Sequence, residues 1–201
     1  GGITAVLEAN RSVISKAVGD DVDVKYILDL RDFPDSPYAD RIVHEITPIL
    51  EDGEVELVCE TMGGSHPALE YSLSCMKAGK SVVTSNKEVV ANFGDELLRC
   101  AKENGVLLME AMWARLVPGT IKLLEIVKSG RLGDIMGVEG KFCYTMDEDE
   151  MDHHVFKPEN GGGSLLDVGV YGLNFAQWYL GNEVKEIKAQ AELYGGVDSH
   201  T

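Results

Sequence analysis

The alternation of short apolar stretches with amphipathic stretches, from residue 56 to residue 109, restricts the fold more than any other feature. Residues typical of buried strands dominate "ELVCETMGG" (56–64), "SVVT" (81–84) and residues 106–109. Between them lie stretches of helical period: one that we expect to start near Ser65 as N-cap, and one at 88–103 that Asn104 and Gly105 terminate. Because strands that alternate with helices of this length form parallel βαβ units, the sequence predicts an α/β fold with a doubly wound parallel sheet.

The start of the chain predicts that this sheet lacks its first strand. Residues 3–18 carry apolar residues near helical period, and the first expected strand follows only at 23–30. A dinucleotide-binding fold normally begins with a strand and a glycine-rich phosphate loop. We interpret Gly1 and Gly2 as the end of such a loop. Residues 1–112 are therefore expected to form a Rossmann-like domain that is truncated at its N-terminus.

After Trp113 the pattern changes. A helix is expected at 119–129, and a glycine turn with a second helix within 160–181. The segments 134–146 and 183–194 alternate like strands of a more exposed, antiparallel sheet. Residues 113–201 are thus expected to form part of an α+β substrate domain that is cut short at its end.

Composition and net charge restrict the kinds of molecule that the chain is expected to bind. The formal net charge of −16 disfavours nucleic acid and anionic membranes and leaves a small-molecule substrate open. The four cysteines are widely spaced without a CxxC pair, which indicates reduced core thiols of a cytoplasmic protein. No apolar run approaches the ~18 residues of a membrane span, and no signal-peptide pattern opens the chain.

Polar residues follow the expected strands at the edge where α/β sheets bind ligands. Asp29 could accept hydrogen bonds from adenosine ribose hydroxyls, whereas Arg31 could face a 2′-phosphate. The choice between NAD and NADP therefore stays open. The alternative to a cofactor role for these two residues is a solvated loop. Glu110 follows the strand expected at 106–109 and is a candidate for substrate binding rather than cofactor binding. The remaining candidates for cofactor binding are Gly2, Met62, Gly63, Gly64, Ser85, Asn86 and Lys87.

Residues 1–106 resemble the nucleotide-binding half of homoserine dehydrogenases, through "VKYILDLRDFPDSPY", "ELVCETMGG", "PALEYSLSCMKAGKSVVTSNKEVVA" and "AKENGV". Residues 107–201 instead resemble the Gfo/Idh/MocA oxidoreductases, in the branch of dihydrodiol and xylose dehydrogenases. The motifs are "LLMEAMWARLVPGTIKLLEIVKSGRLGDI" and "FKPENGGGSLLDVGVYGLNFAQWYLG". The two resemblances meet near Val106, on a strand that both families share. Natural recombination, a fused gene prediction and a laboratory chimera are all compatible with this.

Both resemblances imply that Lys87 acts beside a nicotinamide. The Gfo/Idh/MocA family has a lysine in an E-K-P corner at this place, although its glutamate and proline are absent here. The dihydrodiol branch implies that Tyr171 is the acid/base and that Asp167, four residues earlier, orients the pair or binds a substrate hydroxyl. Trp113 and Arg115 resemble the family's W-x-R, which can form a wall of the substrate site; interdomain packing is the alternative.

The acidic segment "DEDEMDHH" (147–154) offers oxygen and nitrogen ligands: Asp147, Asp149, Asp152, His153 and His154. The resembling family needs no metal, so a solvated loop is the favoured interpretation and no metal site is expected.

The sequence therefore predicts an NAD(P)-dependent oxidoreductase that transfers hydride between nicotinamide and a secondary alcohol or carbonyl of a sugar or cyclic diol. The alternatives are homoserine dehydrogenase activity and a non-catalytic nucleotide-binding scaffold. The resembling families commonly self-associate through the second-domain sheet, so a homo-oligomer formed by that sheet is also expected.

Overall fold

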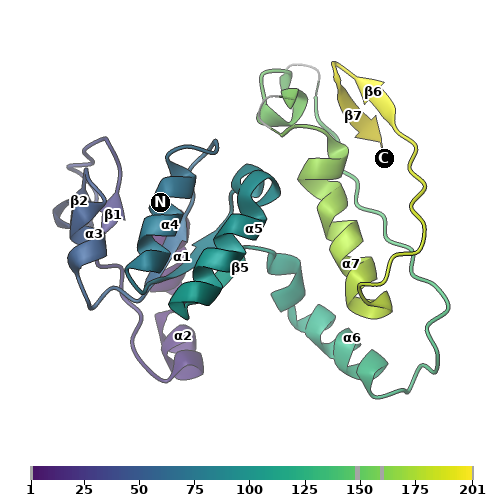
Figure 1. Ribbon diagram of the computed structural model, residues 1–201, viewed down its shortest axis with the longest axis horizontal. Coiled ribbons are helices and arrows are strands. Elements are labelled where there is room, and N and C mark those ends of the chain that lie inside the picture. Colours follow the sequence, from purple (N-terminus) through teal and green to yellow (C-terminus); the bar gives the residue numbers. More distant parts are fainter. Residues whose placement is uncertain (1, 148–149, 159–160, 201) are drawn as a thin grey trace.

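The computed structural model describes residues 2–147, 150–158 and 161–200, and its first half holds parallel strands and helices (Figure 1). Strands β3 (Leu57–Glu60), β4 (Ser81–Thr84) and β5 (Leu108–Glu110) form a parallel sheet in the order β3-β4-β5. Helices α4 (Ala68–Lys77) and α5 (Lys87–Asn104) connect them. This arrangement confirms the predicted α/β class with parallel strands.

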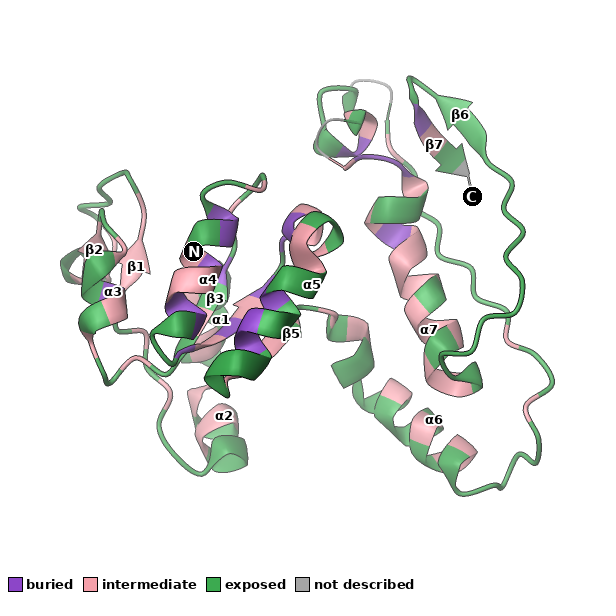
Figure 2. Cartoon of the chain, viewed as in Figure 1, coloured by how far each residue is buried: buried purple, intermediate pink, exposed green. Residues whose placement is uncertain are grey.

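The core of the first half lies between α4, α5 and one face of this sheet. Met76, Val82, Val89 and Leu97 are almost fully buried there. Figure 2 shows buried residues gathered on α4, α5 and the strands beside them. Along β3, by contrast, Leu57 and Cys59 point to the opposite face and are exposed, because successive strand residues alternate between faces.

The prediction of one continuous sheet is wrong within the described residues. Strand β1 (Ile27–Leu28) pairs in parallel with β2 (Ile42–Val43) in a separate two-stranded sheet, and only this short part of the segment expected at 23–30 is a strand. Strand β2 and the five-residue helix α3 (Thr47–Glu51) were not predicted. Elements of two to five residues are too short for hydrophobic periodicity to reveal.

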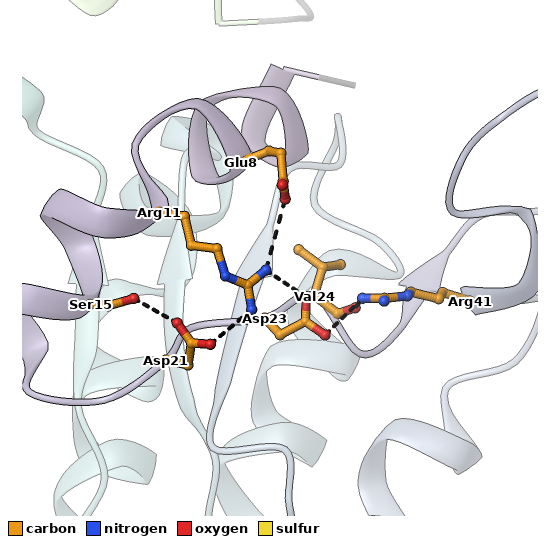
Figure 3. Close-up of polar contacts among 7 residues, drawn as sticks. All are labelled: Glu8, Arg11, Ser15, Asp21, Asp23, Val24 and Arg41. Atoms are coloured by element: carbon orange, nitrogen blue, oxygen red, sulfur yellow. Dashed lines mark hydrogen bonds and ion pairs between the residues drawn. The ribbon is translucent and has the colours of Figure 1, made fainter.

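The N-terminal helix expected at 3–18 is two helices, α1 (Gly2–Ala9) and α2 (Arg11–Val18), separated at Asn10. Figure 3 shows the polar contacts that connect them to the following chain. Arg11 pairs with Asp21 at 3.0 Å, and Asp21 also accepts from Ser15 Oγ at 2.8 Å. Because these groups are solvent-exposed, we assign the network an orienting role rather than a large stabilising one.

The second half begins with the 3-10 turn η2 (Trp113–Leu116) and helix α6 (Pro118–Lys128). After the 3-10 turn η4 (His154–Phe156), a π-helical turn, η6 (Leu165–Gly169), leads into α7 (Val170–Leu180). An antiparallel hairpin of β6 (Glu192–Tyr194) and β7 (Val197–His200) follows.

Of the two strand predictions in the second half, one is wrong and the other is correct only at its end, where the strand is antiparallel as expected. Residues 134–146 contain no strand, and of 183–194 only the last three residues form β6. The alternating pattern is real, but a strand also needs a neighbour for its backbone groups, and no described strand runs beside 134–146.

Two of the four cysteines depart from the predicted core location. Cys75 and Cys100 are buried, whereas Cys59 and Cys143 are exposed, and all four are free thiols. Among the described helices, none is both long and apolar enough to cross a membrane.

The neighbouring leucines of α5 give a matched test of the core. Leu97 is fully buried and Leu98 is 59% exposed. We expect Leu97→Ala to lower the free energy of unfolding by about 3 kcal/mol, because a cavity replaces buried methyl groups. Leu98→Ala is the control and should change it by less than about 1 kcal/mol. Urea denaturation measures both, and equal effects would contradict this placement of the core.

Candidate active site

The corner between β4 and α5 is built around the side chain of Asn86. Its Oδ1 accepts from the backbone N–H of Val89 at 3.1 Å and caps the N-terminus of α5. Its Nδ2 donates to the carbonyl oxygens of Met62 at 3.1 Å and Gly64 at 2.7 Å. Asn86 is 6% exposed, so these bonds are shielded from water. One buried amide therefore fixes the start of α5 to the turn that follows β3.

A buried carboxylate also stabilises this corner. Glu60, the last residue of β3, accepts from Thr84 Oγ1 and from the backbone N–H of Met62. The backbone N–H of Asn86 donates to Thr84 Oγ1 at 3.0 Å, and that of Ser85 donates to the Glu60 carbonyl at 3.1 Å. The ends of β3 and β4 are thereby joined as one hydrogen-bonded unit.

Lys87 is the first residue of α5 and reaches the second half of the chain. Its Nζ donates to the backbone carbonyl of Asp167 at 2.8 Å and lies 3.4 Å from Asp167 Oδ1. The same ammonium lies 5.8 Å from the centre of the Tyr171 ring, within range of a cation–π contact. The structure thus brings together the three residues predicted to be catalytic; their roles stay predictions.

Asp167 is held by groups from three elements. Tyr144 donates to Oδ2 at 2.8 Å, Lys87 faces Oδ1, and His154 Nε2 lies 3.8 Å from Oδ1. Burial opposes ionisation, but the Tyr144 hydrogen bond and the Lys87 charge outweigh it and hold the pKa of Asp167 below its usual value. Burial, together with the bond to Asp167, raises the pKa of Tyr144 to about 12. The carboxylate is ionised and the phenol protonated throughout the physiological range.

Tyr171 lies between two aromatic rings. The Phe142 ring stacks on it at 5.4 Å between centroids with 22° between planes, and the Trp113 ring lies tilted at 5.7 Å. Trp113 Nε1 donates to the Tyr171 hydroxyl oxygen at 3.1 Å. The hydroxyl retains its own proton for donation to another group. Aromatic faces of this kind suit the apolar faces of a ring-shaped substrate.

The other substrate-site candidates lie close in sequence to this cluster. Glu110 is the half-buried last residue of β5, opposite Thr84 in the sheet register. Arg115 is exposed and belongs to η2, the same 3-10 turn as Trp113.

The predicted adenosine end of the cofactor site lies after β1. Arg31 forms a bidentate pair with Asp29, with both N–O distances 3.0 Å, and its backbone N–H also donates to Asp29. These bonds lower the pKa of Asp29 to about 2. Asp29 is thus an ionised acceptor, as a ribose would require, and Arg31 is engaged by it. Gly2 is exposed at the start of α1.

The residues present fit a nicotinamide dinucleotide. Asp29 offers an anionic acceptor at one strand end, and Lys87 a cation at another. Between them, Gly64 adopts a positive φ of +75° with no heavy atom within 4 Å of where a Cβ would stand, which leaves the turn open to close approach. An acidic acceptor for ribose hydroxyls at a strand end is typical of dinucleotide-binding folds, and Asp29 follows β1 of the two-stranded sheet, while Lys87 follows β4 of the three-stranded sheet.

The helix that carries Asp167 and Tyr171 is positioned by its entry. A Cβ at Gly162 would lie 2.6 Å from the Val155 carbonyl, so glycine is required there, in agreement with the predicted tight turn. Ser164 occupies the N-cap position of η6, but its side chain forms no cap hydrogen bond. Its hydroxyl donates to Asp198 Oδ2 at 2.8 Å, and the same oxygen accepts from the backbone N–H of Leu165 at 2.7 Å. The hairpin therefore provides the cap.

Ser65 departs from its prediction as N-cap. Helix α4 begins at Ala68 with Pro67 as its N-cap residue, and Ser65 Oγ donates to Glu88 Oε1 at 2.6 Å. This bond connects the turn after β3 to the first turn of α5, because Glu88 directly follows Lys87.

The acidic segment gives no metal centre in the part of the chain that the structure describes, where groups of three or more His, Cys, Asp and Glu side chains arranged for a metal ion are absent. Asp149, one of the candidate ligands, lies outside the described residues. His154 faces Asp167 instead, and its ring lies 4.3 Å from that of His153.

Sequence reasoning missed Phe142, Tyr144 and Asp198. The alternation in "GKFCYTM" contained a usable signal, since residues two apart on an extended segment share a face. Phe142 and Tyr144 do contact the same helix, at Tyr171 and Asp167. Nothing in the sequence near Asp198 indicated its cap contact 33 residues away.

Comparisons with known families support both resemblances. Residues 2–110 match the family of homoserine dehydrogenase NAD-binding domains, and residues 120–200 match the GFO/IDH/MocA C-terminal domain. A homoserine dehydrogenase from Bacillus subtilis is 30% identical over 142 residues, which cover 68% of this chain and 33% of that protein. Trans-1,2-dihydrobenzene-1,2-diol dehydrogenase from Sus scrofa is 32% identical over 155 residues, 75% of this chain and 44% of that protein.

Solved structures give the same picture. Homoserine dehydrogenase from S. aureus superposes with a TM-score of 0.50 at 28% identity, covering 54% of this chain and 28% of its own. A candidate oxidoreductase from Bacillus subtilis, yvaA, superposes with a TM-score of 0.56 at 25% identity, covering 82% of this chain and 47% of its own. The chain spans less than half the length of each of these four relatives.

The Asn86 side chain gives a testable prediction for the corner. We expect Asn86→Ala to lower the free energy of unfolding by about 2 kcal/mol, because it removes an N-cap and two buried hydrogen bonds. Asn92→Ala, at an exposed position of the same helix, is the control and should cost within about 0.5 kcal/mol. Denaturation of both variants by urea measures the difference, and equal values would refute the capping role.

Proposed function

Because the chain belongs, over residues 2–110, to the family of homoserine dehydrogenase NAD-binding domains, we propose that it binds NAD or NADP and forms the catalytic centre of an oxidoreductase. The reaction would transfer hydride between nicotinamide and a secondary alcohol or carbonyl of a sugar or cyclic diol. The observation that carries this proposal is the contact of Lys87 with Asp167 and Tyr171, since the first residue comes from one matched family and the other two from the second.

Each residue has a role that follows from its contacts. A bound nicotinamide would accept or supply the hydride. Tyr171 would move the alcohol proton, and the indole N–H of Trp113 would hold its oxygen in place. Lys87 would place positive charge beside the reacting oxygen, with Asp167 as its counter-ion.

The substrate class is argued from the aromatic side chains. Trp113 and Phe142 flank Tyr171 and would bind the apolar face of a ring, with the acid/base at its edge. The name of the diol dehydrogenase relative is consistent with such a substrate. Homoserine, a small flexible amino acid, is the second candidate, and the match of residues 2–110 is the observation in its favour.

Cofactor binding is the first test. We expect NADH or NADPH to bind this chain with a change in nicotinamide fluorescence that saturates on titration. Asp29→Ala should weaken NADH binding, whereas Asp35→Ala, an exposed carboxylate in the loop after β1, should leave it unchanged. Absence of saturable binding by either nucleotide would favour a non-catalytic scaffold. Tighter NADPH binding would place the 2′-phosphate beside Arg31.

Turnover of substrate is the second test. We expect Lys87→Met and Tyr171→Phe each to lower kcat by about 10²–10⁴-fold. The first removes the positive charge beside the reacting oxygen, and the second removes the group that transfers the proton. Lys77→Met, on the exposed last turn of α4, is the matched control and should retain activity. Reduction of NAD or NADP is measured with cyclic diols, aldoses and homoserine as substrates, which separates the two substrate classes. Unchanged rates in both variants would contradict the roles assigned to Lys87 and Tyr171.

A further inference from the structure

Residues 140–144 run along the helix that carries the candidate catalytic residues. A Cβ at Gly140 would lie 3.9 Å from the Cα of Gly172, so the two backbones approach closely there. Phe142 stacks on Tyr171, and Tyr144 reaches Asp167. Successive residues of one face of the segment therefore meet successive turns of η6 and α7. The alignment of the segment with the helix therefore rests on the backbone approach at Gly140 and the ring stacking at Phe142 as well as on the Tyr144 hydrogen bond.

The two oxygens of Asp167 face different partners. Oδ1 lies 3.4 Å from Lys87 Nζ, while Oδ2 accepts from the Tyr144 hydroxyl at 2.8 Å. A carboxylate can rotate about its Cβ–Cγ bond, and a short bond to one oxygen fixes that rotation. Because Tyr144 stays protonated at every working pH, it is a permanent donor.

We propose that Tyr144 is the positioning residue of this site: by donating to Asp167 Oδ2 it holds the carboxylate turned with Oδ1 toward Lys87. The catalytic meaning of this arrangement rests on the proposed function, whereas the arrangement itself does not. Without Tyr144, Oδ2 would lose its hydrogen-bond donor and the carboxylate would be free to rotate about its Cβ–Cγ bond, away from the orientation in which Oδ1 faces Lys87.

The charged and titratable groups that face Asp167 come from each element packed against it. Lys87 belongs to α5, His154 to η4, and Tyr144 to the segment before the acidic loop. The pKa of Asp167 is lowered in the folded chain, so its ionised form is favoured above the ordinary pKa near 4 and is lost as the pH falls through the folded value. Removing Tyr144 moves that loss to higher pH.

The test is carbon-13 NMR of the carboxyl groups in this chain across pH 2–7, with the Asp167 signal identified by its absence from Asp167→Asn. Loss of one hydrogen bond to a charged group predicts that Tyr144→Phe raises the Asp167 pKa by about one unit. Tyr194→Phe, an exposed tyrosine of β6, is the matched control and should leave it unchanged. An unchanged Asp167 pKa in folded Tyr144→Phe overturns the proposal.

A reciprocal measurement uses a different variant, so a Tyr144→Phe chain that failed to fold would not end the test. Carbon-13 titration of Tyr144 should give a pKa of about 12 in the unmodified chain and a lower value in Asp167→Asn, where burial still raises the pKa but the hydrogen bond to an anion is lost. An identical Tyr144 pKa in both overturns the proposal.

Turnover gives the catalytic readout and separates this proposal from the proposed function. In an active protein, Tyr144→Phe should shift the acidic limb of the kcat profile upward, and it should have no further effect when Asp167 is already Asn. Additive losses would contradict positioning through Asp167. A protein that turns over no substrate refutes the proposed function, while the two NMR titrations still decide the role of Tyr144.

Discussion

The contact between Lys87 and Asp167 joins residues that are 80 positions apart, and the candidate site exists only where it forms. As an ion pair it is weak, because the two side chains are 40% and 23% exposed and such pairs contribute about 0–1 kcal/mol. The pair therefore does not create the arrangement. Each partner has to be placed by its own half of the chain before the two can meet.

The two halves place these residues by different means. Lys87 is fixed by a buried corner, where the amide of Asn86 and the carboxylate of Glu60 satisfy the surrounding backbone and hydroxyl groups. Asp167 lies in a half with a thin core, in which the buried apolar residues among those described are Val155, Val168 and Val197. There the glycine-rich turn and the Asp198 cap hold the helix through backbone hydrogen bonds. Local opening should accordingly begin in the second half.

What the sequence could predict follows from the range of the interactions involved. Gly105 and Asn86 end and begin α5 through contacts within a few residues, and the end at Gly105 was predicted from the sequence. The parallel sheet was predicted because short apolar stretches alternate with α4 and α5, which are long enough to show helical periodicity. Ser65 was assigned to the nearest helix by a local rule, yet its hydroxyl bonds to Glu88, 23 residues away, and the hydroxyl of Ser164 likewise bonds to Asp198, 34 residues away. Local patterns do not record such partners.

The segment 134–146 shows how a correct pattern can serve a different structure. Its alternation predicted a strand in a sheet, but its residues pack on a helix instead, with Gly140 against Gly172 and Phe142 on Tyr171. Both structures require every second side chain to face an apolar neighbour, so periodicity alone cannot distinguish them.

The two halves of the chain would contribute different parts of the proposed active site. Lys87 comes from the first half, at the corner between β4 and α5. Tyr171 and the aromatic rings beside it come from the second half. A change of substrate would thus require changes in residues such as Phe142 and leave the corner at Asn86 untouched. Under this proposal the position of the lysine constrains the chemistry, and the second half constrains which molecule undergoes it.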